Sequence, residues 1–369
     1  MKVNTISLNS VRLNTIALNH IGEIRSGGGG SKPSPIPQWI REHIVFYYDV
    51  KKQGATNETL KESAYLQDLS GKGRRMKLNN FLFAEMSGVG GYNDNFSNWK
   101  TDSNNGVVKI ESDSSIVMQS VKIEYRGILY QDSSKNATLK CNITGITEEL
   151  KGKLIFRYTD AEGGKNITLE NGYFEFNSSE YEGLSGWYGF TSKQPIDNCN
   201  ITITQIPEYP GALVTDGVDD YGLVENLSSG VKMLFMTVNP IEDSNSSKMY
   251  YSQRKDPIKF SPFYIFTVGG SIAYPGNQDG VTYINGVLNK SIKVNELFGV
   301  KHIITTVNAN VKPETSKAPS FFWEEGNTKN YCSKLAFYNS IAFDSIPTEA
   351  DGFTEQELID YVITNIIGQ

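Results

Sequence analysis

Apolar residues recur with an unusual spacing at the start of the chain. The segment from Val3 to Val11, VNTISLNSV, returns ten residues later as LNTIALNHI, and its apolar positions are separated by alternating steps of three and two. The period of five fits neither a 3.6-residue helix nor a two-residue strand repeat. Two such short repeats bury too little surface to be stable alone, so we predict that another chain completes this segment. The predicted assembly positions are Val3, Ile6, Leu8, Val11, Leu13, Ile16, Leu18 and Ile21. A loose tail with an accidental repeat is the alternative interpretation.

A change of composition follows this repeat. Gly27 to Gly30 form a glycine run, and prolines then occupy positions 33, 35 and 37. A glycine run is flexible, whereas closely spaced prolines hold the chain extended. We therefore predict an N-terminal arm over residues 1–26 and a linker over residues 27–38.

From Trp39 onward, short runs of β-branched and aromatic residues alternate with clusters of Gly, Asn, Asp and Ser. This pattern is typical of an all-β sandwich or jelly roll. The strands predicted in this way are residues 43–48, 107–110, 117–125, 137–143, 153–158, 173–176, 199–206, 231–238, 263–268, 281–284, 302–307 and 334–343. One helix is predicted near the C-terminus, where Thr354 and Glu357 form a capping box before an amphipathic run. We expect that helix to pack against the sheet.

Composition and charge exclude several classes of function. The 369 residues are enough for two domains or one long β domain, and 35 basic against 41 acidic residues give a net charge of -6. That charge gives no general attraction to nucleic acid or to anionic membranes. No stretch has the ~20 apolar residues needed to cross a bilayer, and polar Asn and Thr interrupt the N-terminus where a signal peptide needs an apolar run. We expect no nucleic-acid partner, no membrane insertion and no secretion by that route.

The residues that usually hold metals or perform nucleophilic catalysis are few. Cys141, Cys199 and Cys332 lack metal-ligand spacing, and we predict that they are reduced core residues. Their separation neither supports nor excludes a pair between the first two. The three histidines are far from one another in the sequence, which disfavours a histidine metal site or a Ser-His-Asp triad.

Three segments resemble a known family. Residues 68–73 (DLSGKG), followed by residues 78–81 (LNNF), resemble an early motif of LamG-type concanavalin A-like domains, and residues 216–221 (DGVDDY) and 281–287 (VTYINGV) resemble two later ones. The resemblance implies a concanavalin A-like jelly roll over residues 39–98 and 209–369, with the C-terminal helix as its end. Between the first and second motifs, which are closer in that family, lies a stretch of about 110 residues, 99–208, with its own strand pattern. We predict that residues 99–208 are a second β-sandwich inserted in a surface loop, where insertions are tolerated.

Aromatic residues cluster in the predicted insertion. Tyr181, Trp187 and Tyr188 are candidates for contact with a glycan, because an aromatic face can stack on the C–H groups of a sugar ring. The alternative, which we favour, is that most aromatic residues of this cluster belong to the core.

The arm, the Gly/Pro linker and a LamG-like domain with the segments FYYDVKKQGATNE and EMSGVGGY together resemble structural proteins of Bacteroides phages, including crAss-like phages. The resemblance implies a non-enzymatic virion protein that serves as a head fibre, capsid decoration or tail appendage. It would assemble in the host bacterial cytoplasm and lie on the virion surface without a cofactor. Residues 1–26 would bind other virion proteins and further copies of the chain, as a homo-oligomer of two or three chains. The sandwiches would adhere weakly to host-surface or mucus glycans.

Two further possibilities come from the acidic residues. Concanavalin A-like folds also host glycoside hydrolases, which need two carboxylates facing each other across the sugar. Glu111 and Asp113 alternate, but the third acid of an E-x-D-x-E strand is missing. A glycan-processing enzyme is therefore only an alternative to the structural protein. A bacterial carbohydrate-binding protein is another alternative. Asp216, Asp219 and Asp220 could hold calcium, which takes six to eight oxygen ligands. A tight turn capped by aspartates needs the same residues, and we favour that interpretation.

Overall fold

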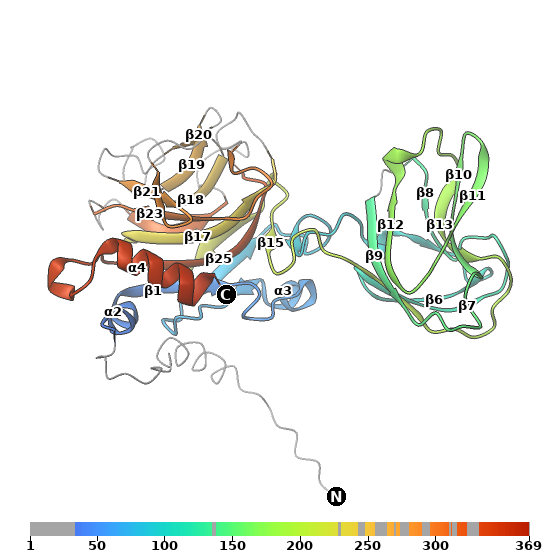
Figure 1. Ribbon diagram of the computed structural model, residues 1–369, viewed down its shortest axis with the longest axis horizontal. Coiled ribbons are helices and arrows are strands. Elements are labelled where there is room, and N and C mark those ends of the chain that lie inside the picture. Colours follow the sequence, from blue (N-terminus) through green and yellow to red (C-terminus); the bar gives the residue numbers. More distant parts are fainter. Residues whose placement is uncertain are drawn as a thin grey trace, which may run out of the picture. The chain divides into compact units, whose positions relative to one another are not determined.

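The chain divides into two compact units (Figure 1). The computed structural model describes residues 34–134, 138–227, 230–242, 248–254, 264–268, 271–273, 280–289, 296–309, 311, 316–322 and 332–368. Unit 1 comprises the described residues up to Phe83, Ser87–Val89 and those from Gly211 onward. Unit 2 comprises Ala84–Met86 and Gly90–Pro210. Each unit has its own sheets and its own core, and each is described by itself below.

Unit 1 contains two antiparallel sheets. In the first, the order is β22-β21-β23-β17-β25-β15-β4, and β1 pairs with β25. Its strands are β1 (Ile44–Asp49), β4 (Gly88–Val89), β15 (Leu213–Val214), β17 (Met233–Pro240), β21 (Val281–Ile284), β22 (Val287–Asn289), β23 (His302–Val307) and β25 (Leu335–Phe343). In the second sheet, the order is β2 (Tyr65–Leu66), β3 (Met76–Asn79), β16 (Tyr221–Val224), β24 (Ser316–Phe321), β18 (Lys248–Arg254), β19 (Tyr264–Val268) and β20 (Ser271–Ala273).

The main core of unit 1 lies between these two sheets. Side chains alternate along a strand, so Phe46 and Tyr48 of β1 face the same side, and both rings contact Phe321 of β24 at centroid distances of 5.9 and 6.1 Å. Tyr47, between them, joins a different cluster on the opposite face of the first sheet. Every residue of β1 and of β17 is buried. Both faces of this sheet are therefore covered, which explains why successive residues of its central strands are buried and not only every second one.

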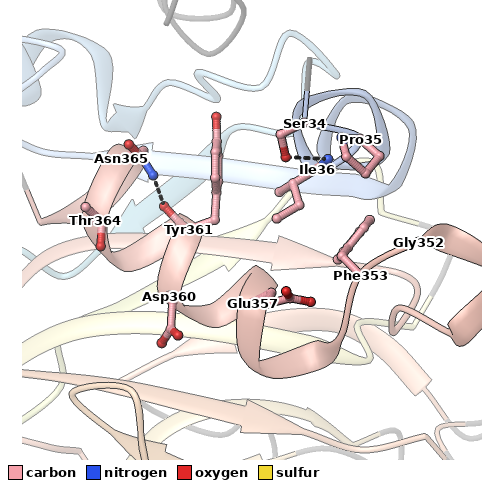
Figure 2. A pocket seen from close by; sticks show the side chains of 10 residues that line it. All are labelled: Ser34, Pro35, Ile36, Gly352, Phe353, Glu357, Asp360, Tyr361, Thr364 and Asn365. Carbon is pink, nitrogen blue, oxygen red and sulfur yellow. Dashed lines mark hydrogen bonds between the residues drawn. The ribbon is translucent and has the colours of Figure 1, made fainter. Parts of the chain in front are cut away.

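Helices cover the outer face of the first sheet. The helix α2 (Ile36–His43), α4 (Glu355–Val362) and the π-helical turn η7 (Ile363–Ile367) share one apolar cluster with residues of β1, β17 and β25. The predicted C-terminal helix is confirmed, since Thr354 and Glu357 form the capping box and Leu358 and Val362 are buried. A hollow of about 460 Å³ remains between the start of α2 and α4. Figure 2 shows the side chains that line it. Ser34, where the described chain begins, lies at its rim.

The linker prediction is wrong for residues 36–38. They form the first turn of α2, with Pro35 at the N-cap and Pro37 in the first turn. Proline is tolerated there because the first amides of a helix have no intrahelical acceptor, and its fixed φ suits the helix. Trp39 and Ile40 then anchor the helix in the cluster of α4, so burial outweighs the extended preference of isolated prolines. Beyond α2 and α4, the short helical elements are α3 (Asn57–Ser63), η1 (Phe96–Asn98), η2 (Ser178–Glu180) and η6 (Glu349–Asp351).

Unit 2 is a sandwich of two five-stranded antiparallel sheets. One runs in the order β11 (Gly163–Thr168), β10 (Leu154–Asp160), β13 (Trp187–Ser192), β8 (Leu129–Asp132) and β5 (Lys100–Thr101). The other runs β12 (Gly172–Asn177), β9 (Thr138–Thr144), β14 (Ile201–Gln205), β7 (Ser115–Val121) and β6 (Gly106–Ser112). Its core includes Phe156, whose ring contacts Phe176 at 4.6 Å and Phe190 at 5.1 Å. The unit's two ends meet, because the Tyr209 amide donates a 2.8 Å hydrogen bond to the Gly90 carbonyl.

The all-β class is confirmed, since the described chain is mostly antiparallel strand with one short C-terminal helix. The cysteines are free as predicted, with Cys141 and Cys332 buried and Cys199 half-buried. Within the described residues, no helix combines the length and the apolar character that a bilayer crossing requires.

Candidate functional site

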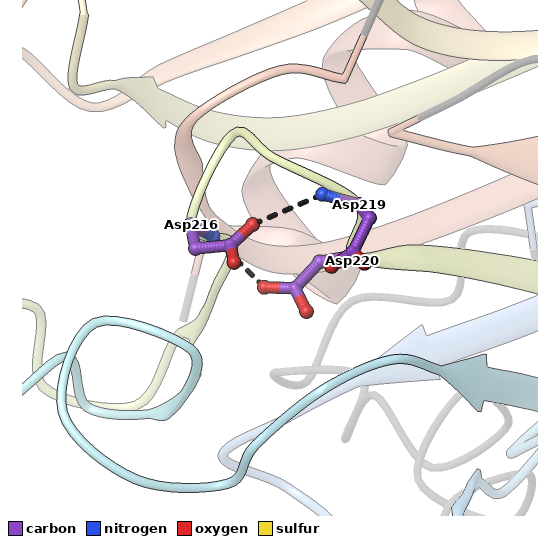
Figure 3. A group of neighbouring side chains, drawn as sticks. All are labelled: Asp216, Asp219 and Asp220. Carbon is purple, nitrogen blue, oxygen red and sulfur yellow. Dashed lines mark hydrogen bonds between the residues drawn. The ribbon is translucent and has the colours of Figure 1, made fainter. Parts of the chain in front are cut away.

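The loop between β15 and β16 brings three carboxylates together (Figure 3). Oxygens of Asp216, Asp219 and Asp220 all lie within 4.8 Å of one another. The Asp216 carboxylate accepts hydrogen bonds from the amides of Val218 at 2.7 Å and Asp219 at 3.4 Å. Gly217 allows the turn, because its φ of 78° and the 2.8 Å approach of a Cβ at this position to Lys334 both disfavour a side chain.

Asp220 is the buried member of this cluster, with no exposed surface. Its carboxylate accepts a hydrogen bond from the Asp216 amide at 2.8 Å and another from the Ser87 hydroxyl at 3.0 Å. Burial penalises the charged form and raises the pKa of Asp220 to about 7, although these two hydrogen bonds oppose the shift. The side chain can therefore exist as acid or carboxylate near neutral pH.

These hydrogen bonds are the ones that the turn interpretation requires. One oxygen of Asp216 and both oxygens of Asp220 accept donors of this loop or of Ser87. A calcium ion would have to share those oxygens and recruit further ligands to reach six. Calcium binding by the three aspartates stays the untested alternative, and the described contacts favour the structural turn that we predict.

The structure also places two of the family-like segments beside each other. The strand β3 pairs with β16, so that Asn79 lies opposite Tyr221, and Asn80 donates a 3.1 Å hydrogen bond to the Asp219 carbonyl. Earlier in the chain, the Asp68 carboxylate accepts the amides of Tyr47, Ser70 and Arg74 at 2.9–3.0 Å. Both acidic motifs thus hold turns of unit 1 in place.

The hollow between α2 and α4 has a mixed lining (Figure 2). Pro35, Ile36 and Phe353 contribute apolar surface, while Glu357 and Asp360 contribute carboxylates. The Glu357 carboxylate is used by the helix cap, since it accepts the Thr354 amide at 2.7 Å and the Thr354 hydroxyl at 3.0 Å. These hydrogen bonds hold the pKa of Glu357 below its ordinary value. The cap therefore accounts for this carboxylate without any catalytic role.

One of the three predicted glycan contacts is wrong. Tyr188 is fully buried, and its ring contacts Phe176 at 5.2 Å and Trp99 at 5.8 Å in the core of unit 2. It faces inward because the alternation of β13 places it with Phe190, so it is not available to a sugar. The favoured alternative, that most aromatic residues of this cluster are core, is confirmed for Phe174, Phe176, Tyr188 and Phe190.

The other two predicted contacts are half-buried. Trp187 contacts Tyr130 at 5.8 Å, and Tyr181 stacks on Phe176 at 5.2 Å. Neither residue presents as much surface as Tyr173, which is 63% exposed and was not among the predicted contacts. The sequence carried a signal for it. In the run Tyr173-Phe-Glu-Phe176, Glu175 must face water, and strand alternation puts Tyr173 on the same side.

The predicted assembly positions, Val3 to Ile21, and the glycine run lie outside the described residues. No protein-family model matches the chain, and neither the curated proteins nor the solved structures contain a match to it.

Proposed function

We propose that the chain is a non-enzymatic structural protein of a phage virion. Its N-terminal arm binds the particle, and two β-sandwich units are exposed as a head fibre, capsid decoration or tail appendage. In this proposal unit 1 is a LamG-like jelly roll. The pairing of β3 with β16, which brings the LNNF and DGVDDY segments together, supports that assignment.

The observation that carries the proposal is the presence of two separately cored sandwiches in one chain. Unit 2 has its own aromatic core, and its ends meet at Gly90 and Tyr209. Unit 2 adds exposed surface to the protein without contributing to the core of unit 1, as expected for a protein displayed on a particle. Several acidic side chains of unit 1, including Asp68, Asp220 and Glu357, accept hydrogen bonds that hold turns or a helix cap. Because these carboxylates stabilise turns and a helix cap, they favour a structural role for the protein over a catalytic one.

The arm is tested by comparing the oligomeric state of the full chain and of residues 27–369 by light scattering. The full chain should form a discrete oligomer of two or three copies, and the shortened chain should be monomeric with unchanged circular dichroism. In the full chain, Ile16→Asp should also abolish the oligomer, because it places a charge at a predicted apolar position of the repeat. Thr15→Asp, with the same charge at the next residue, is the matched control and should leave the oligomer intact.

The location is tested separately. An antibody against unit 2 should label intact virions in electron micrographs. If virions carry no label and both forms of the protein are monomeric, the structural role is wrong.

A further inference from the structure

Tyr173 occupies an open position on unit 2. It lies on β12, the edge strand beside β9 (Figure 1). Its side chain is on the face opposite the buried Phe174 and Phe176. At 63% exposure it is the most exposed aromatic side chain among the large hydrophobic residues described. The core does not explain a tyrosine at this position, since the neighbouring phenylalanines already fill it.

A hydrogen bond fixes the direction of the Tyr173 ring. Its hydroxyl donates to the Glu175 carboxylate at 2.5 Å. These residues are two apart on one face of the strand, a separation of about 7 Å, so the phenol must lean along the strand to make this contact. In this orientation one face of the ring is exposed to solvent. Because the hydrogen bond already restricts the Tyr173 side chain, less conformational entropy is lost when a ligand stacks on the ring.

Hydrogen-bonding groups surround the ring. Asn142 lies opposite Tyr173 on β9, and Lys140 lies opposite Glu175. Thr204 on β14 continues the row beyond Asn142. Lys140 forms a 2.7 Å ion pair with Glu208, and the Asn93 amide donates to the same carboxylate at 2.7 Å. One aromatic ring thus borders a set of donors and acceptors on a single face of the sheet.

We propose that this face binds a neutral glycan, an inference that rests on the proposed function in that unit 2 must be exposed on the virion. The C–H face of a pyranose ring stacks on Tyr173, and its hydroxyls bond to Asn142, Lys140 and Glu175. A protein partner would require an apolar, well-packed patch around the ring, whereas the neighbours here are polar. The glycan is neutral because Glu175 and Glu208 outnumber Lys140, which leaves the face net negative and unfavourable to sialylated or sulfated sugars.

The test uses the full-length protein on an array that carries neutral hexosides, N-acetylhexosaminides, sialylated glycans and sulfated glycans. The strongest neutral ligand is then titrated by calorimetry. Tyr173→Ala should weaken binding by about tenfold or more, as expected for removal of a main stacking contact. Tyr173→Phe keeps the ring and should weaken binding by only a few-fold, through loss of its hold on Glu175.

Two variants control for nonspecific effects. Ile110→Ala removes another exposed side chain, on the opposite edge strand of the same sheet, and should leave affinity unchanged. Trp187→Ala tests the competing contact on the other sheet and should also leave it unchanged. Melting temperatures of the Tyr173 variants should match the wild type, since the side chain is exposed.

The inference is overturned if the array shows no neutral ligand, if only acidic glycans bind, or if Tyr173→Ala binds as well as the wild type. None of these outcomes affects the labelling of virions or the oligomeric state of the arm variants. Failure of the glycan site is therefore distinguishable from failure of the proposed structural role.

Discussion

Two buried carboxylates in unit 1, Asp68 and Asp220, differ in how many hydrogen-bond donors the protein supplies in place of water. Asp68 accepts three backbone amides, from Tyr47, Ser70 and Arg74. Asp220 accepts one backbone amide and one hydroxyl, in a site with no exposed surface. A buried charge with few donors is costly, and the protein reduces that cost by keeping the proton. This explains why burial raises the pKa of Asp220 to about 7.

The raised pKa of Asp220 predicts a pH-dependent stability. The folded-state pKa lies above the ordinary value of 3.8, so the folded protein binds this proton more tightly than the unfolded chain. The resulting stabilisation is complete below about pH 4 and is lost as the pH rises through about 7. Its size is at most about 1.4 kcal/mol for each unit of pKa difference. Unfolding free energies of wild type and Asp220→Asn, measured by urea titration between these pH values, should diverge as the pH rises.

The asparagine variant resembles the protonated acid. Its carbonyl oxygen can accept the Asp216 amide and its amide can donate to the Ser87 hydroxyl, so it should keep its stability through neutral pH. Asp219→Asn, a change in the same loop at a half-buried position, is the control and should retain most of the wild-type pH dependence. Parallel slopes for wild type and Asp220→Asn would contradict the assignment. The titrations are done in EDTA, and a rise in midpoint on adding calcium would instead assign an ion to the loop.

The sequence identified this loop but not its chemistry. The DGVDDY pattern is sufficient to predict a tight turn, because glycine and aspartate meet the needs of its backbone. It does not reveal that Ser87 approaches from another part of the chain, and the burial of Asp220 depends on that approach. The prediction that Tyr188 contacts a glycan was wrong for a related reason. The sequence shows that Tyr188 belongs to an aromatic cluster, but the way β13 lies in the sheet decides which of its alternating side chains face the core.

At the scale of elements, α4 shows a close agreement between local signals and packing. Thr354 accepts the Glu357 amide at 3.2 Å, and the Glu357 carboxylate accepts the Thr354 amide at 2.7 Å. The same helix buries Leu358, Ile359 and Val362 against the first sheet. Capping and amphipathicity thus both favour a helix that begins at Glu355.

This cap predicts a measurable loss of stability. Thr354→Ala should lower the unfolding free energy of unit 1 by about 1 kcal/mol, because the Glu357 amide loses its acceptor and the Glu357 carboxylate loses the hydroxyl donor. Fluorescence of Trp39, which packs in the α4 cluster, reports on this unit during a urea titration. Thr364→Ala, at an exposed position in η7, should cost little, since alanine favours helix. Equal effects of both substitutions would show that the cap contributes nothing.

The other elements were predicted from the sequence with different accuracy. Alternating β-branched and aromatic residues located β1, β9, β12, β23 and β25 to within one or two residues. The helix α2 was missed because its prolines favour an extended chain until Trp39 and Ile40 find a surface to cover. Sheet order could not be predicted at all. The pairing of β1 with β25 joins segments from opposite ends of the described chain, and no local pattern specifies it.

At the scale of the whole molecule, the chain enters the main part of unit 2 after Val89 and leaves it before Gly211, at two adjacent points in each unit; the short segment Ala84–Met86 also belongs to unit 2. In unit 1, Val89 at the end of β4 lies opposite Leu213 of β15, so the chain leaves and returns on paired strands. In unit 2, Gly90 and Tyr209 are hydrogen-bonded. Neighbouring ends mean that neither unit needs the other to close its chain, since joining them costs little loop entropy.

Both units should therefore fold when separated. Residues 90–210 expressed alone should unfold in one cooperative transition and keep tryptophan fluorescence typical of the buried Trp99. The remaining chain, with Val89 joined to Gly211 through a short glycine-asparagine turn, should retain the transition of unit 1. In the full chain, Phe156→Ala should destabilise the transition of unit 2 by about 3–5 kcal/mol through the cavity it leaves, without moving that of unit 1. A single transition in the full chain that Phe156→Ala shifts as a whole would instead mean that the two cores are energetically coupled. Unit 2 would then not fold independently of unit 1.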